Sequence, residues 1–202
     1  MKKRPVVYLL IALFFAAAII IIENPFKPRV DDFSFDYLIP DYDTEDVAQV
    51  KVSQLLDGAM LTKGEDGWSI TEIITKQKRD LLEGEGRKID EPKPMEGDSQ
   101  RIESALGIFS GISKGLLVSK NPDNRGKYQV GPAGLQIAAF DKNDKKIFDL
   151  IIGKNGPDYT STFVRKADED KVYLIRQMAV GVFSPRATDW KKRKIEEEPK
   201  SK

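Results

Sequence analysis

The hydrophobic pattern is dominated by an unbroken apolar run at residues 6–22, VVYLLIALFFAAAIIII. As an α-helix rising ~1.5 Å per residue, this run would reach about 25 Å, near the lower limit for crossing a bilayer core. Lys2, Lys3 and Arg4 precede it, and basic residues at this position favour a cytoplasmic N-terminus. The pattern predicts a single transmembrane anchor at 6–22, with residues 1–5 in the cytoplasm and the main domain outside it.

Two other interpretations of the apolar run stay open. A cleaved signal peptide fits the small residues Ala16 and Ala18, but cleavage there would leave the isoleucines at 19–22 at the new N-terminus. A buried core helix normally keeps a polar stripe, and this run has none. No Cys follows the run, which excludes a lipoprotein.

Residues 23–46 combine a stalk with an acidic and aromatic segment. Pro25 and Pro28 prevent a continuous helix and favour an extended chain. The following carboxylates and rings are candidate partner contacts: Asp31, Asp32, Phe33, Phe35, Asp36, Tyr37, Asp41, Tyr42 and Asp43. The alternative is a surface loop that packs its rings on the domain and leaves its acids in water. A calcium loop is excluded, because Asp46 stands where the glycine is needed and Val52 where the last acid is needed.

Most of the apolar positions between residues 47 and 190 recur with period two, which predicts strands. Turn residues between them predict three hairpins, formed by 59–63 with 68–74, 135–141 with 146–152, and 160–165 with 172–176. The run at 147–152 is apolar at every position but one, so we expect a strand covered on both faces. Trp68 is expected in the core rather than in a ligand site.

Helical periodicity is clearest at residues 99–113, where Asp98 or Ser99 is available as the N-cap. Ser184 and Pro185 predict a short last helix that carries Trp190. The charged, glycine- and proline-containing segment 76–98 predicts a mobile loop, and 191–202 a charged tail. The predicted fold class is therefore α+β: an N-terminal transmembrane helix, then a mixed, mostly antiparallel sheet over 47–190 with one main packing helix.

The composition excludes several classes of function, mainly because the residue types that they need are absent. The net charge is +1, which gives no global field to attract nucleic acid. The chain has no His and no Cys, which rules out Ser-His-Asp and Cys-His nucleophile pairs and the usual zinc sites. It also lacks a phosphate-binding glycine loop. The sequence therefore predicts no catalytic, cofactor-binding or metal-binding residues, and a protein that is not an enzyme.

A series of motifs from Asp98 onward resembles a known bacterial family. The motifs are a helix ending in Gly111-Ile112, then LLVSKNP at 116–122, KYQVGP at 127–132, LIIGK at 150–154, and Ser184-Pro185 followed by Asp189-Trp190-Lys191. This order is similar to the family called domain of unknown function 4340, over roughly residues 46–192. Members of that family are commonly encoded beside ABC-transporter subunits of the gliding-motility auxiliary kind.

The resemblance implies a function as well as a fold. We expect a non-enzymatic accessory subunit of an envelope ABC-transporter complex, held at the bacterial inner membrane with its main domain periplasmic or extracytoplasmic. Its partners would be the membrane and a permease or auxiliary subunit, with no cofactor and no nucleic acid. The alternative is an anchored envelope module that binds a polymer, a lipid or a small ligand.

Overall fold

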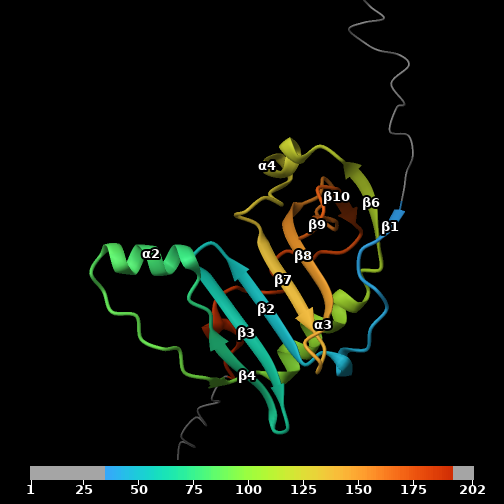
Figure 1. Cartoon of the computed structure of the whole chain (residues 1–202). Coiled ribbons are helices and arrows are strands. Elements are labelled where there is room, and N and C mark those ends of the chain that lie inside the picture. The colour runs from blue at the N-terminus through green and yellow to red at the C-terminus, as the bar shows by residue number, and fades with distance from the viewer. Residues whose placement is uncertain (1–34, 193–202) are drawn as a thin grey trace, which may run out of the picture. The chain divides into compact units, whose positions relative to one another are not determined.

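The computed structural model describes residues 35–192, in which ten strands form one sheet (Figure 1). Its order is β1-β6-β10-β9-β8-β7-β2-β3-β4-β5, and each neighbouring pair of strands is antiparallel. The strands are β1 (Phe35–Tyr37), β2 (Gln49–Gln54), β3 (Asp57–Gly64), β4 (Gly67–Glu72), β5 (Met95–Glu96), β6 (Lys114–Ser119), β7 (Leu135–Phe140), β8 (Lys146–Asn155), β9 (Thr162–Lys166) and β10 (Val172–Ile175). The sheet is therefore built from local hairpins, which are joined to one another by long-range pairs such as β2 with β7.

The three hairpins expected from the sequence are confirmed, and their turns show why they form. β3 and β4 meet at Gly64 and Gly67, and Gly67 has a φ of 122° that a side chain would disfavour. In the turn between β7 and β8, the Asp141 carboxylate accepts the backbone N–H groups of Asn143 at 2.8 Å and Lys145 at 2.9 Å. These local interactions fix the register before distant strands need to pair.

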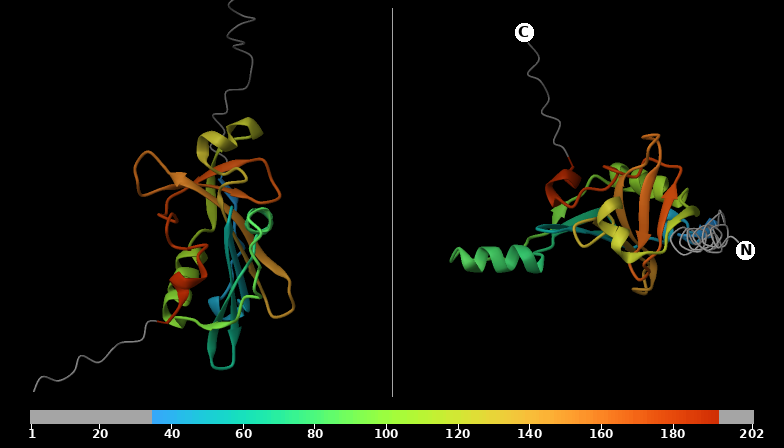
Figure 2. Two further views of the ribbon diagram at one scale, coloured as in Figure 1. Left: turned by 90° about the vertical axis from the view of Figure 1, so that its left-hand side faces the viewer. Right: turned by 90° about the horizontal axis from the view of Figure 1, so that it is seen from above.

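The helices are few and mostly short. They are α2 (Lys76–Gly84), α3 (Ser99–Ser110) and α4 (Arg125–Tyr128), with 3₁₀ turns η1 (Thr44–Asp46), η2 (Pro122–Asn124) and η3 (Ala187–Trp190). Asp98 caps α3 as expected, because its side chain accepts the N–H of Arg101 at 3.1 Å. Figure 2 shows α3 and η3 on the same side of the strands and α2 projecting away from them. No residue of α2 is buried.

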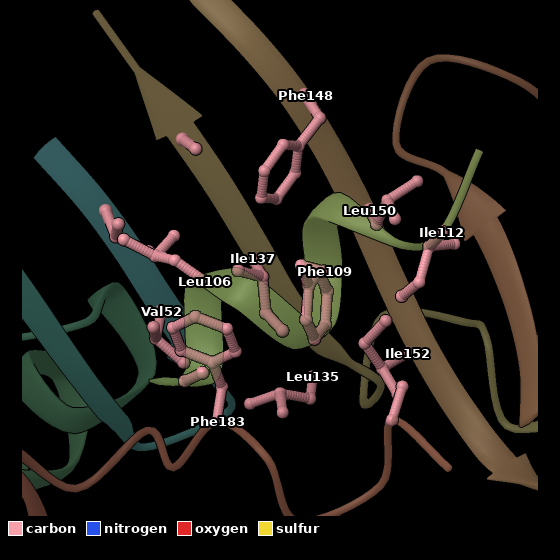
Figure 3. Packing of buried hydrophobic residues seen from close by; sticks show 14 of the residues in the cluster. Val52, Leu106, Phe109, Ile112, Leu135, Ile137, Phe148, Leu150, Ile152 and Phe183 are labelled. Atoms are coloured by element: carbon pink, nitrogen blue, oxygen red, sulfur yellow. The ribbon is translucent and has the colours of Figure 1, made fainter. Parts of the chain in front are cut away.

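The main core lies between α3 and the face of the sheet that it covers. Figure 3 shows Leu106 and Phe109 of α3 facing Ile137 and Leu150 of the neighbouring strands β7 and β8, and all four are buried. The ring of Phe109 also meets Phe183 edge to face at 5.0 Å. Trp68 belongs to the same cluster, so its expected place in the core is confirmed.

The opposite face of the sheet is covered over part of β6, β8, β9 and β10. There Val130, Ile151 and Val172 form a second, smaller buried cluster. Phe148, Leu150 and Ile152 of β8 point to the main core while Ile151 points to this cluster, so β8 is buried on both faces as the sequence predicted. The second cluster depends on the loop after α4, which lies over the sheet at this point.

The predicted fold class needs correction. The described pairs are all antiparallel, so the sheet is not mixed, and the expected last helix is only the 3₁₀ turn η3. The transmembrane helix predicted at 6–22 lies outside the described residues, and within 35–192 no helix is long and apolar enough to cross a membrane. The structure is a large antiparallel sheet with few helices, because the period-two segments outnumber the single amphipathic helix.

Two segments also differ from the expected boundaries. The sheet begins at β1 rather than after residue 46, because β1 pairs with β6. The segment 76–98, expected as a mobile loop, contains α2 and the short strand β5. Thr75 begins α2 by accepting the N–H of Lys78 at 3.2 Å, a cap that the charged composition of the segment obscured.

Candidate functional site

The candidate contact residues from the sequence fall in two separate places. Asp31, Asp32 and Phe33 lie outside the described residues. Phe35, Asp36 and Tyr37 form β1, at the edge of the sheet. Asp41, Tyr42 and Asp43 lie in the loop before η1, where Tyr42 contacts α3.

β1 turns two aromatic rings outward. Phe35 is 55% exposed and Tyr37 is 66% exposed, and their alternation places them on one face of the strand. The Lys114 ammonium of β6 lies 4.9 Å from the centre of the Tyr37 ring, a cation–π distance. The edge strand therefore presents two rings and a positive charge side by side.

Asp36, between these rings, holds β1 in place. Its Oδ2 lies 2.9 Å from the hydroxyl of Tyr173 and 3.4 Å from the ammonium of Lys171. The Tyr173 hydroxyl also lies 3.0 Å from Oε2 of Glu169. Burial, aided by these two carboxylates, raises the pKa of Tyr173 above its ordinary value, so the phenol stays protonated as a donor. Asp36 therefore ties β1 to β10, while Phe35 and Tyr37 stay exposed.

Two of the residues before η1 have roles within the fold. Tyr42 donates its hydroxyl to the carbonyl of Leu106 at 2.9 Å, and its ring lies 5.6 Å from that of Phe148. Burial raises the pKa of Tyr42. Asp43 caps η1 by accepting the N–H of Glu45 at 3.0 Å. Asp41 is exposed. This part of the segment behaves as the alternative interpretation expected, packing its ring and solvating its acid.

Sequence reasoning missed a hollow of about 680 Å³ at the end of the sheet where β8 finishes and β7 begins. We call it the glycine-walled hollow. It is lined by Gln54, Arg125, Gly126, Gln129, Gly131, Pro132, Ala133, Gly134, Leu135, Ile152, Gly153, Val180, Gly181, Phe183 and Pro185. Four separate segments meet there, from residue 54, residues 125–135, residues 152–153 and residues 180–185, and only the repeated glycines at 126, 131, 134, 153 and 181 gave a signal in the sequence.

The wall formed by residues 129–134 is held by hydrogen bonds from both sides. Gly134 donates its N–H to the carbonyl of Gly131 at 2.9 Å, which closes a tight turn. Gln54 of β2 donates its side-chain amide to the carbonyl of Ala133 at 3.0 Å. On the opposite side, Arg165 of β9 donates Nε to the carbonyl of Val130 at 3.0 Å. The hollow is therefore a formed feature of the fold rather than a gap under a loose loop.

The turn between β2 and β3, beside this wall, carries two exposed leucines. Leu55 is 51% exposed and Leu56 is 42% exposed, although apolar side chains give a two-residue turn no advantage. Leu55 has a φ of 45°, a left-handed conformation that is strained for a bulky side chain. Leu55 also lines a smaller hollow of about 400 Å³ that shares Gly131, Pro132 and Gly134 with the first. Strain of this kind is often kept at functional surfaces.

Paired glycine substitutions measure that strain. Leu55→Gly is expected to unfold at a higher urea concentration than Leu56→Gly, because only Leu55 is held at positive φ. The expected difference in the free energy of unfolding is about 1–2 kcal/mol. The two leucines have similar exposure and lie in one turn, so each variant is the other's control. Equal stability of the two variants would show that the turn is not strained.

Comparison with known proteins identifies one match. The model of the family described as domain of unknown function (DUF4340) matches residues 88–202, and this confirms the resemblance seen in the sequence. Comparison with the curated proteins and with the solved structures gives no match. The matched range contains α3, β6 to β10 and most of the glycine-walled hollow, while β1 to β4 precede it.

Proposed function

The chain belongs to the DUF4340 family of domains of unknown function, and on that premise we propose that it is a non-enzymatic accessory subunit of an envelope ABC-transporter complex. In this proposal the domain works at the extracytoplasmic face of the bacterial inner membrane, with the apolar run 6–22 as its attachment. It binds a permease or auxiliary subunit of the gliding-motility kind through β1.

The observation that carries the proposal is the outward face of β1. Phe35 and Tyr37 are exposed on the edge strand, and large aromatic side chains are enriched at the centres of protein interfaces. An edge strand also offers backbone N–H and C=O groups with which a strand of a partner can pair. Asp36 anchors β1 from its other face, so the rings are held in place before a partner arrives.

The double variant Phe35→Thr with Tyr37→Thr tests this surface. Threonine keeps the strand propensity of β1 while removing both rings. We expect recovery of the permease or auxiliary subunit to fall roughly tenfold or more, since buried aromatic contacts commonly contribute about 2 kcal/mol each to binding. The measurement is affinity purification of the tagged full-length protein from its native membrane in mild detergent, with mass spectrometry of the proteins that co-purify.

Tyr159→Asn is the matched control. Tyr159 is an exposed aromatic residue in the loop between β8 and β9, and asparagine tolerates its φ of 58°. The control is expected to recover the partner as the wild type does. The proposal fails if the wild-type protein never co-purifies with a transporter component, and the surface assignment fails if the β1 variant recovers the partner at the wild-type level.

A further inference from the structure

We infer that the glycine-walled hollow binds an uncharged, largely apolar ligand that carries a hydroxyl or amide group. This site is separate from β1 and does not depend on the proposed transporter partner.

The size and lining of the hollow fit a small ligand better than a single side chain of another protein. Its volume of about 680 Å³ lies within the range of about 300–1,000 Å³ that is usual for ligand pockets. Apolar walls come from Pro132, Leu135, Ile152, Val180 and Phe183, which belong to both sides of the hollow. An apolar chain or ring placed here would lose water contact on several sides.

Two of the lining glycines stand where an added side chain would meet no close neighbour, and the backbone does not require glycine at either. A Cβ built on Gly126 meets no other atom within 4 Å, and one on Gly131 comes no closer than 4.0 Å to the Cβ of Arg125. Neither residue has a positive φ. Since glycine inside a helix such as α4 is less stable than alanine, the absence of a side chain at Gly126 calls for a reason outside local packing. Space for a ligand provides that reason.

The charges and polar groups indicate which ligand. Arg125 is the single charged residue among those that line the hollow. Its Nη2 is paired with the carboxylate of Asp170, while its buried Nε has no hydrogen-bond partner among the described residues. The charge of Arg125 is thus balanced by Asp170, so a charged ligand would lose its hydration without finding an unbalanced opposite charge. The free Nε–H can instead donate to a hydroxyl or carbonyl oxygen of an uncharged ligand. The amide nitrogen of Gln54 is used by the carbonyl of Ala133, which leaves the amide oxygen to accept a hydroxyl or N–H from a ligand.

The wall that would meet this ligand is already in place. Arg165 holds the carbonyl of Val130 from behind, and the Gly131–Gly134 turn is closed by its own hydrogen bond. A pocket that is formed in advance avoids the entropy cost of ordering loops when the ligand binds. The uncharged ligand would enter without rearrangement of the sheet.

A photoreactive diazirine analogue of 1-decanol tests the inference on the full-length protein reconstituted in lipid vesicles. After illumination, mass spectrometry maps the labelled residues, and we expect labels at 125–135 and 178–185. Excess 1-decanol should displace the probe from these peptides, whereas decanoate and decyltrimethylammonium, which carry the same chain with a charged head group, should not.

Substitutions that fill the hollow give the second half of the test. Gly126→Phe and, separately, Gly131→Leu add bulk at two residues that line the hollow, so each is expected to lower labelling of these peptides roughly tenfold. Gly84→Phe, at the exposed end of α2 where a Cβ also meets nothing, is expected to label as the wild type. Thermal unfolding of each variant shows whether it is folded, and two filling variants are used so that one misfolded protein does not decide the result.

Three outcomes would overturn the inference: labels spread evenly over the domain, equal labelling of folded filling variants and wild type, or displacement by decanoate as effective as displacement by decanol. Co-purification of a transporter subunit is independent of all three, so the failure of this site and the failure of the β1 surface can be told apart.

Discussion

Arg165→Met is expected to lower the free energy of unfolding by about 3 kcal/mol. Arg165 is only 6% exposed, and within the described residues its guanidinium forms no salt bridge; it donates to backbone carbonyls instead. Nε reaches Val130 at 3.0 Å, and Nη1 reaches Lys166 and Ala167 at 3.1 Å and Glu169 at 2.7 Å. Methionine fills part of the space but removes these donors; of the four carbonyls, that of Lys166 keeps the backbone N–H of Glu169 at 3.2 Å. Urea unfolding followed by circular dichroism measures the loss.

The size of this loss follows from two opposing effects. Hydrogen bonds to a charged group contribute about 1.5–3 kcal/mol each at most, and a buried carbonyl without a donor costs a further ~1–3 kcal/mol. Removing the guanidinium also removes the cost of burying it, which offsets part of the loss. That burial cost is visible as a lowered pKa of Arg165, to which the nearby charge of Arg125 adds. The guanidinium nevertheless stays protonated, since arginine is not deprotonated in proteins.

Arg176→Met provides the matched control. Arg176 directly follows β10 and is exposed, so its loss is expected to change stability by no more than about 0.5 kcal/mol. Equal effects of the two substitutions would show that the carbonyl contacts of Arg165 do not hold the loop over the second cluster. Arg165→Lys separates charge from geometry: a single ammonium cannot reproduce the branched set of donors, so most of the loss should remain.

The local pattern of apolar and turn residues was sufficient to predict the hairpins, but it was insufficient to predict the order of strands in the sheet. The turn at Glu65–Asp66 and the Asp141 turn each lie within a few residues of the strands they join, so the sequence identifies them directly. The pairing of β2 with β7 joins segments about 85 residues apart, and nothing in the period of either strand specifies it. The same holds for β1 with β6, which moved the start of the domain toward the N-terminus.

The candidate sites show the same limit. The sequence singled out the alternating acids and rings, but it left open whether these rings contact a partner or pack on the domain, and so could not separate the exposed Phe35 and Tyr37 from Tyr42, whose ring packs within the fold. The glycine-walled hollow is assembled from Gln54 and from the segments 125–135, 152–153 and 180–185, which come together only after the sheet has formed. Arg165 was also invisible, because a charged residue near the end of a strand usually faces water.

Trp190→Ala is expected to lower the free energy of unfolding by about 3–5 kcal/mol, the usual range for removing a buried large aromatic side chain. Trp190 is fully buried, its ring lies 5.3 Å from that of Phe183, and the guanidinium of Arg101 lies 5.2 Å from its centre. Its indole N–H donates to the carbonyl of Ser184 at 2.8 Å, and its own carbonyl accepts the N–H of Asp98 at 2.8 Å. The residue therefore joins the C-terminal segment to the start of α3. Calorimetry or urea unfolding of the variant measures the effect.

The control compares the two tryptophans of the chain through the milder change to phenylalanine. Both are buried, but within the described residues the indole N–H of Trp68 has no hydrogen-bond partner, whereas that of Trp190 does. Both substitutions remove similar volume, and only Trp190→Phe also breaks a hydrogen bond and leaves the Ser184 carbonyl without its donor. Trp190→Phe should therefore be less stable than Trp68→Phe by about 1 kcal/mol. If Trp68→Phe lowered the free energy of unfolding more, the prediction would be wrong. Packing of the Trp68 ring in the β3–β4 hairpin would then contribute more to stability than the contact between the C-terminal segment and α3.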